Sequence, residues 1–323
     1  MRKMLYEEVV RFYSYNKIGS MDELSWIVKR GIILTKCHLD FDVEGNIMLL
    51  CSLCYINRIF TQDAIYFCLD IYVSNVFITL AVLYPNLTEI KGRQINEAGM
   101  KALGTIKTLR SVEFTDATST ICGVLMLCSG YANLKCLKLF VYSKTYDSEY
   151  HIDHRCVTKI AKRCPGLTSF SLHAPDTLTD EALWPLWTLT YLKELDLTGF
   201  SDITSMGVQN VMRSIGAKLE VLVLSNVTET DDGWNSTCCD DALLRCIGEY
   251  CPKLREFAVS TQPGRVSDAA FTSLFQGCPL LETLRCKKLT APVLIDLAEY
   301  CPRLLKLILH WGYTDTGITA VAS

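Results

Sequence analysis

The chain has 323 residues, half of them hydrophobic, so it can bury a large core as one elongated repeat domain or as two compact domains. It carries 32 Lys and Arg against 35 Asp and Glu, a net charge of −3, and the cations are spread along the sequence. This pattern argues against a disordered tail and against generic nucleic-acid or anionic-membrane binding, which needs a concentrated basic face. It leaves room only for a local basic patch.

Residues 1–30 are predicted to form an N-terminal helical cap. The stretches "MLYEEVVRFYSY" and "MDELSWIVKR" read as two amphipathic helices, with Ser20 as a candidate cap of the second. Glu7 and Glu8 interrupt the segment before an apolar signal-peptide core forms. We therefore expect no secretory signal and a location in the cytoplasm, the nucleus or both.

Residues 65–85 form a mostly apolar run, for which a membrane span and a buried helix are the two interpretations. Asp70 and Asn75 would be costly in the middle of a bilayer. The run also ends at Pro85, where other segments of this chain change from helix to strand. A buried repeat helix is predicted, and no membrane contact.

A unit Leu-x-x-apolar-x-apolar recurs along the rest of the chain at spacings of 22 to 35 residues, and the average of about 27 is within the range of leucine-rich repeats once insertions are allowed. Each unit predicts a short strand. An earlier strand is predicted around Leu34, Cys37 and Leu39, and a degenerate unit at residues 56–61. The first leucines of the clear units are Leu87, Leu109, Leu134, Leu167, Leu192, Leu219, Leu254, Leu281 and Leu304.

A helix is predicted after each strand. Pairs such as Thr179-Asp180 and Ser267-Asp268 supply the cap and the acidic first turn that a helix start prefers. Proline ends the helix, and the cysteine before it fills a small buried slot. These corners are Cys164-Pro165, Cys251-Pro252, Cys278-Pro279 and Cys301-Pro302.

At these residues the sequence resembles the cysteine-containing leucine-rich repeats of F-box/leucine-rich-repeat ubiquitin-ligase receptors. The resemblance implies an α/β solenoid over residues 31–323, a right-handed horseshoe of about nine to eleven repeats with parallel strands on the concave face and helices on the convex face. It also implies recognition of protein substrates. No Leu-Pro-x-Glu-Val-like F-box precedes the repeats, so recruitment of a ligase adaptor stays open. The chain stops inside an expected helix without a polar cap, so either this end is truncated or a partner covers it.

The 16 cysteines are expected to be reduced, because several share one repeat position and no secretory route is visible. Zinc is the alternative at Cys51 with Cys54, at residues 238–251 and at residues 151–154, but the first is a lone pair in an apolar, repeat-like helix and the other two lack a matched partner. The motifs of hydrolases, phosphate-binding loops and zinc proteases do not occur. We predict no metal, cofactor or catalytic residue; a thiol enzyme is the alternative from another class.

Recognition of a protein partner is the remaining function, as a ligase substrate receptor or as a scaffold with no ubiquitin link. On the concave face, cations beside an aromatic ring would anchor an acidic or phosphorylated segment. A solvated basic edge is the alternative. The residues of this predicted patch are Arg285, Lys287, Lys288, His310 and Trp311.

Two insertions, residues 142–155 and 228–239, explain the longest repeat spacings. Insertions in solenoids collect on the binding rim, so Trp234, which lies among acidic residues, is a second candidate contact. The alternative is a pair of tolerated loops.

Overall fold

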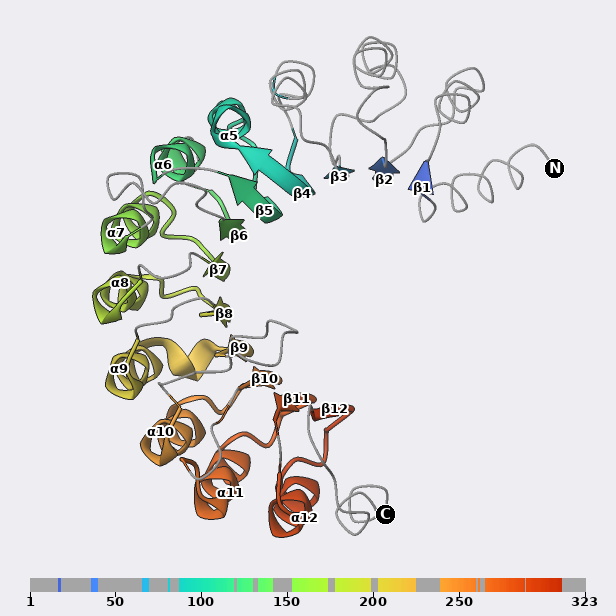
Figure 1. Ribbon diagram of the computed structural model, residues 1–323, viewed down its shortest axis with the longest axis vertical. Coiled ribbons are helices and arrows are strands. Elements are labelled where there is room, and N and C mark those ends of the chain that lie inside the picture. Colours follow the sequence, from blue (N-terminus) through green and yellow to red (C-terminus); the bar gives the residue numbers. More distant parts are fainter. Residues whose placement is uncertain are drawn as a thin grey trace, which may run out of the picture. The chain divides into compact units, whose positions relative to one another are not determined.

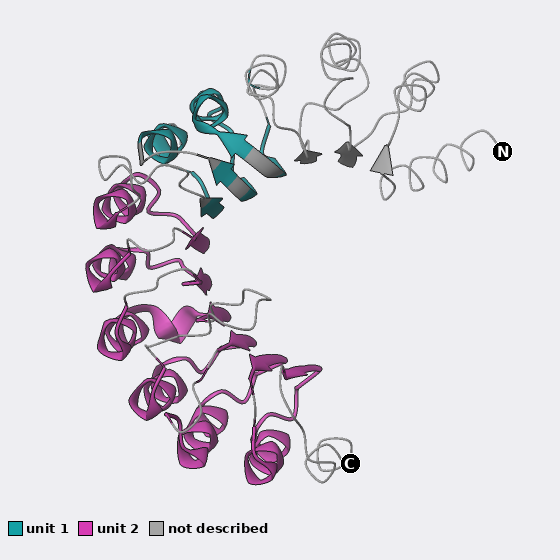
Figure 2. Ribbon diagram, in the orientation of Figure 1, with its two compact units in different colours: residues 1–151 teal, residues 152–323 magenta. Residues whose placement is uncertain are grey.

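The computed structural model describes the chain in two compact units, Met1–His151 and Ile152–Ser323 (Figure 2). Each unit is a stack in which one layer contains parallel strands and the other contains helices (Figure 1). The described residues are 17–18, 36–39, 66–69, 81, 87–118, 121–129, 133–141, 153–173, 178–198, 203–224, 239–259, 261, 265–287 and 289–309.

In unit 1 the strands pair in sequence order, each parallel to the next. Helix α5 (Glu97–Leu103) follows β4, and helix α6 (Ile121–Ser129) follows β5. The strands are β1 (Lys17–Ile18), β2 (Lys36–Leu39), β3 (Tyr66–Leu69), β4 (Glu89–Asn96), β5 (Ser111–Thr118) and β6 (Cys136–Val141).

The prediction of one buried helix over residues 65–85 is wrong at its start. Tyr66–Leu69 form strand β3, which pairs with β2 and β4. The physical reason is that a fully buried strand and a buried helix are both continuous apolar runs, so hydropathy alone does not separate them. Strand β2 confirms the predicted early strand, whereas residues 56–61 lie outside the described residues. Strand β1 lies between the two helices predicted for residues 1–30, and these helices also lie outside the described residues.

In unit 2 the strands again pair in parallel and in sequence order. They are β7 (Ser169–His173), β8 (Glu194–Asp196), β9 (Val221–Val223), β10 (Glu256–Ala258), β11 (Thr283–Cys286) and β12 (Lys306–Leu309). The helices are α7 (His154–Arg163), α8 (Asp180–Leu183), η3 (Trp184–Thr188), α9 (Ser205–Ile215), η4 (Gly216–Lys218), α10 (Asp241–Tyr250), α11 (Asp268–Gly277) and α12 (Ala291–Tyr300).

The core of unit 2 follows the predicted repeat. Each strand begins two residues after its repeat leucine, and the leucines from Leu167 to Leu281 are fully buried. One strand position forms a second buried row across the register: Phe170, Leu195, Leu222, Phe257 and Leu284. Each such side chain contributes about 1.5–3 kcal/mol by burial, so the row is a principal source of stability.

The corner cysteines are buried, as predicted, and the last three of them form a ladder between successive repeats. Cys164, Cys251, Cys278 and Cys301 are the C-terminal cap residues of α7, α10, α11 and α12. The Cys278 thiol donates to the Cys251 carbonyl (Sγ to O, 3.5 Å), and the Cys301 thiol donates to the Cys278 carbonyl (3.7 Å). Burial raises the pKa of Cys278 and of Cys301 to about 12, so both stay protonated donors at neutral pH.

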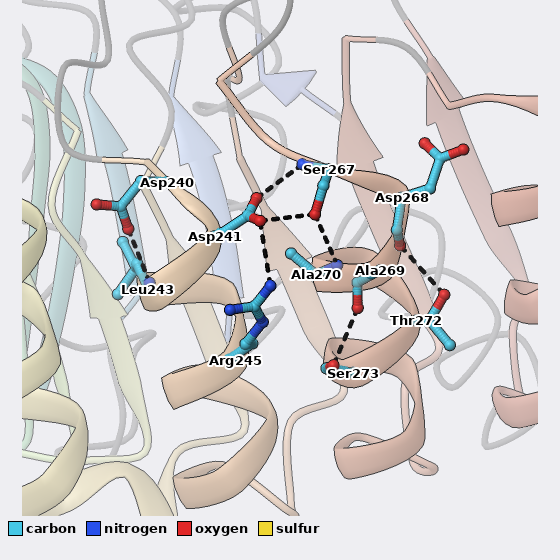
Figure 3. Close-up of polar contacts among 10 residues, drawn as sticks. All are labelled: Asp240, Asp241, Leu243, Arg245, Ser267, Asp268, Ala269, Ala270, Thr272 and Ser273. Carbon is cyan, nitrogen blue, oxygen red and sulfur yellow. Dashed lines mark hydrogen bonds and ion pairs between the residues drawn. The ribbon is translucent and has the colours of Figure 1, made fainter.

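Polar contacts also join the starts of successive helices, as Figure 3 shows for α10 and α11. The Asp241 carboxylate accepts hydrogen bonds from the backbone N–H of Ser267 (2.7 Å) and from its hydroxyl (2.6 Å). Ser267 Oγ in turn accepts from the Ala270 N–H at 3.3 Å, which caps α11. The Ser267 hydroxyl, its N–H and the nearby Arg245 lower the pKa of Asp241.

The same contact recurs at other helix junctions of unit 2. Asp180 accepts from Thr204 through both N–H and hydroxyl (2.7 and 2.6 Å), and Asp268 accepts from the Thr290 hydroxyl (2.8 Å). Between α9 and α10 the earlier helix supplies the hydroxyl and the later one the carboxylate, because Asp240 accepts from the Ser205 hydroxyl at 2.6 Å. Each of these junctions thus places one carboxylate against one hydroxyl.

The cysteine ladder predicts the effect of a minimal change. Cys251→Ser and Cys278→Ser should each lower the free energy of unfolding by about 1–3 kcal/mol, because a hydroxyl replaces a weakly polar thiol in a buried slot. Chemical denaturation measures the loss. Cys122→Ser, at an exposed position, is the control and should change stability by less than about 0.5 kcal/mol. Stoichiometric zinc in the purified protein, lost on substitution, would contradict this account.

The Asp241 contact predicts a pH dependence. Because folding lowers this pKa, the contact stabilises the fold above the unfolded pKa of about 4 and is lost as the pH falls through the lower, folded pKa. Asp241→Asn should therefore cost about 1 kcal/mol at neutral pH, and the difference from the unsubstituted protein should shrink below about pH 4. Urea denaturation at several pH values measures it. Glu249→Gln, on the exposed side of the same helix, is the control, and a pH-independent cost of Asp241→Asn would refute the assignment.

Candidate functional site: the strand face of unit 2

The outward side chains of β7 to β12 form one continuous surface, here called the strand face. Because side chains alternate along a strand, the residues flanking the buried row point away from the core. Register aligns them in two rows. The first contains Ser169, Glu194, Val221, Glu256, Thr283 and Lys306, and the second contains Ser171, Asp196, Val223, Ala258, Arg285 and Ile308.

The second row includes Arg285 of the predicted basic patch, and its side chains are half-buried with one exception. Ala258 is 1% exposed, although its register partners Val223 and Arg285 are half-buried. The Arg285 guanidinium reaches from β11 to Glu256 on β10, two residues before Ala258. A long side chain that crosses the neighbouring strand accounts for burial of the small residue beside it.

The β7–β8 end of the strand face is a hydrogen-bonded set of hydroxyl and carboxylate groups. Ser169 donates to Glu194 (2.7 Å), and Ser171 donates to Asp196 (3.0 Å). His173 Nδ1 lies 2.9 Å from the Thr198 carbonyl. Burial lowers the pKa of His173 despite that carbonyl and Asp196, so the ring is neutral at pH 7. This end therefore offers acceptors to a partner.

The β11 end of the strand face holds the two described residues of the predicted basic patch. Arg285 Nη2 lies 3.2 Å from Glu256 Oε1, and Arg285 Nε is buried with no hydrogen-bond partner among the described residues. Lys287 is half-buried, and loss of hydration lowers its pKa. Lys288, His310 and Trp311 lie outside the described residues, and so does Trp234.

Sequence reasoning missed Glu256. This carboxylate neutralises part of the charge of the patch, and it occupies the first row one strand away from Arg285. The signal was present, because Glu256 directly precedes the buried Phe257 and Arg285 directly follows the buried Leu284, so alternation turns both side chains outward. Finding it required the pairing of neighbouring strands.

Charged pairs also line the entry to the strands. Lys193 Nζ lies 2.7 Å from Glu220, and Arg255 lies 2.7 Å from Glu282, so charge alternates across four successive repeats. All four side chains are partly exposed, and such pairs contribute little to stability. They form a rim of alternating positive and negative charge beside the first row, and salt weakens the attraction within each pair.

The thiols of unit 2 are placed for packing. Cys246 Sγ lies 3.7 Å from the Gln209 carbonyl, and burial raises the pKa of Cys246 and of Cys251. A nucleophilic or metal-binding cysteine needs the opposite shift. Over the described part of the chain, no three His, Cys, Asp or Glu side chains are grouped as a metal site would require.

No helix among the described residues has the length and the apolar content that crossing a membrane requires.

Comparison with known proteins identifies the fold. No family model matches the sequence, and no curated protein matches it either. A chain of the yeast Rad7 and Elc1 complex is similar in structure, with a TM-score of 0.56 and 17% identity over 99% of this chain and 86% of that chain. An internalin (inlF) of Listeria monocytogenes aligns over 95% of this chain and 76% of its own at 12% identity and a TM-score of 0.41. The fold is an α/β leucine-rich-repeat solenoid, as predicted.

The exposure of the Arg285–Glu256 pair leads to a stability prediction. The two side chains are 40% and 35% exposed, so a double-mutant cycle of Arg285→Ala and Glu256→Ala should give a coupling energy below about 1 kcal/mol. Chemical denaturation of the four proteins measures it, and salt should reduce it further. A coupling above about 2 kcal/mol would instead mark the pair as structural and unavailable to a partner.

Proposed function

We propose that the protein is a non-catalytic protein-interaction module whose strand face binds a protein partner. The observation that carries the proposal is the strand face itself, two aligned rows of outward side chains on six parallel strands of unit 2. A rigid sheet presents these groups in a fixed pattern, and polar and charged groups in such a pattern give a partner specificity.

The specific role that we propose is substrate recognition in SCF-type ubiquitin-ligase machinery, in the cytoplasm or nucleus. Two observations support it. The Cys-Pro corners resemble those of F-box/leucine-rich-repeat receptors, and the fold is similar to that of a chain solved in the complex of Rad7 with Elc1. The corner cysteines Cys251, Cys278 and Cys301 are free thiols, which is typical of proteins in reducing compartments.

The partner group that we propose is an acidic or phosphorylated segment bound at the β11 end of the strand face. Arg285 holds Glu256 through a single contact at 3.2 Å, so a carboxylate or phosphate of the partner can replace it with a bidentate pair. Lys288, His310 and Trp311 would extend this contact.

Two further predictions belong to the same proposal. Residues 1–30 would cap the solenoid at residue 31, and Trp234 in the insertion at 228–239 would form a second contact with the partner. Both follow from the general tendency of solenoids to need capped ends and to bind through inserted loops.

Affinity capture tests the ligase role. Cullin and adaptor subunits should co-purify with the tagged full chain, together with a substrate that accumulates when the protein is depleted. Capture of reproducible partners without any adaptor or cullin would instead identify a scaffold. A hydrolytic or transfer activity of the folded protein that thiol alkylation abolishes would overturn the non-catalytic assignment.

Charge reversal tests the strand face. The double change Arg285→Glu, Lys287→Glu should weaken partner capture by about 2 kcal/mol or more, while the melting temperature stays nearly the same. Raising the salt concentration should reproduce part of the loss. Lys253→Glu, Arg303→Glu is the matched control, since both are exposed corner residues and the net charge changes equally. Full retention of all partners by the strand-face variant would reduce the patch to a solvated edge.

A further inference from the structure

The helix side of unit 2 carries three exposed aromatic residues in one repeat, here called the aromatic cluster. Trp184 and Trp187 belong to η3 and are 56% and 42% exposed, and Tyr191, which follows η3, is 64% exposed. Pro185 lies at the start of this short 3-10 helix. Large aromatic side chains grouped on a surface are typical of interaction sites.

The other repeats of unit 2 show that the fold does not require these aromatic residues. Trp187 stands five residues before its repeat leucine, and this position is exposed in every repeat of the unit. Tyr191 stands one residue before the same leucine, where three other repeats carry Lys or Arg. The residues that match Trp187 are Lys162, Ser214, Glu249, Gln276 and Glu299, all polar.

Cations flank the aromatic cluster on both sides. Helices α7 and α9 each pack against η3, and α7 presents the exposed Lys159 and Lys162. At the end of η4, Lys218 Nζ donates to the Thr190 carbonyl at 2.7 Å, directly beside Tyr191. No carboxylate among the described residues forms an ion pair with any of these three lysines.

The nearby carboxylates are already engaged, Glu220 with Lys193 at 2.7 Å beside the strands and two others at the opposite end of the helices. Asp180 accepts from Thr204, and Glu181 lies 3.4 Å from His154 Nδ1. The surface around Trp187 and Tyr191 is therefore apolar at its centre and positive at its rim.

We propose that the aromatic cluster, with Lys159, Lys162 and Lys218, is a docking surface for an acidic protein segment that also carries apolar side chains. Apolar groups of the partner would pack on the Trp and Tyr rings, and its carboxylates would meet the three lysines. A protein fits better than a nucleic acid, because the cations are few and separate and the chain as a whole is acidic. This surface is separate from the strand face, so the two bind independently.

A binding assay with defined probes tests the proposal on the full-length protein. The probe is a fluorescein-labelled peptide of about sixteen residues in which glutamates alternate with leucine and phenylalanine at helical spacing. We expect saturable binding with a Kd below about 100 µM at low salt. Trp187→Gln, which introduces the residue that α11 carries at this position, should weaken binding about tenfold or more.

A second variant relies on charge alone and leaves the packing intact. Lys159→Glu, Lys162→Glu should weaken binding about fivefold at low salt, with little difference from the unsubstituted protein at about 0.5 M salt. Ile295→Gln, which removes an exposed apolar residue of α12, and the strand-face variant Arg285→Glu, Lys287→Glu should both bind normally.

Three results would overturn the proposal. The first is no saturable binding, or equal binding of a peptide with lysine in place of every glutamate. The second is unchanged affinity in both the Trp187 and the lysine variants. The third is tighter binding of a single-stranded oligothymidine through the same residues, which would make this a nucleic-acid surface.

Discussion

The apolar side of each repeat is buried only by its neighbours, and the rest of the structure depends on this constraint. A single strand and helix of this kind cannot enclose a core, but stacking in register buries one leucine and one strand residue per repeat in continuous rows. Register is fixed because a shift by one residue would turn Phe257 and its neighbours to the solvent. The outward rows inherit the same register, so the arrangement of the strand face is a consequence of the core.

Polar groups between repeats are satisfied at two levels, at the helix start and at the helix end. Carboxylates and hydroxyls meet where successive helices begin, as at Asp241 and Ser267, and thiols meet carbonyls where they end, as at Cys278 and Cys251. Both kinds of contact supply hydrogen-bond partners to backbone groups that helix termini leave unpaired. Close packing adds to this, because the Gly277 backbone lies against that of Gly248 and a side chain there would collide with it. The side chains of the strand face and of the outer helix surface are not needed for these contacts between repeats, so their residues can vary with function.

The sequence alone predicted what depends on a single repeat and missed what depends on two. Repeat leucines, corner cysteines and the Ser267 cap are local patterns that the structure confirms, whereas Thr179 precedes α8 without a side-chain capping bond. The strand at Tyr66–Leu69 was lost in an apolar run, because hydropathy alone does not separate a short strand in such a run from a helix. The pairing of Arg285 with Glu256 and the burial of Ala258 depend on which residues the register places side by side.

Comparing the repeats of one chain separates residues that the fold requires from residues that it does not require. A site that occurs only once offers no such comparison. A residue that the fold requires recurs at its position, as cysteine does at the corners of four helices. The fold does not require an apolar residue at an exposed position that is polar in the other repeats, and Trp187 is such a residue in unit 2. Exposing an indole ring gives up hydrophobic stabilisation that burial would provide. The described contacts of this repeat do not account for that loss, so a binding partner that covers the ring is the simpler explanation. The surrounding lysines support it, because they give the surface a positive charge.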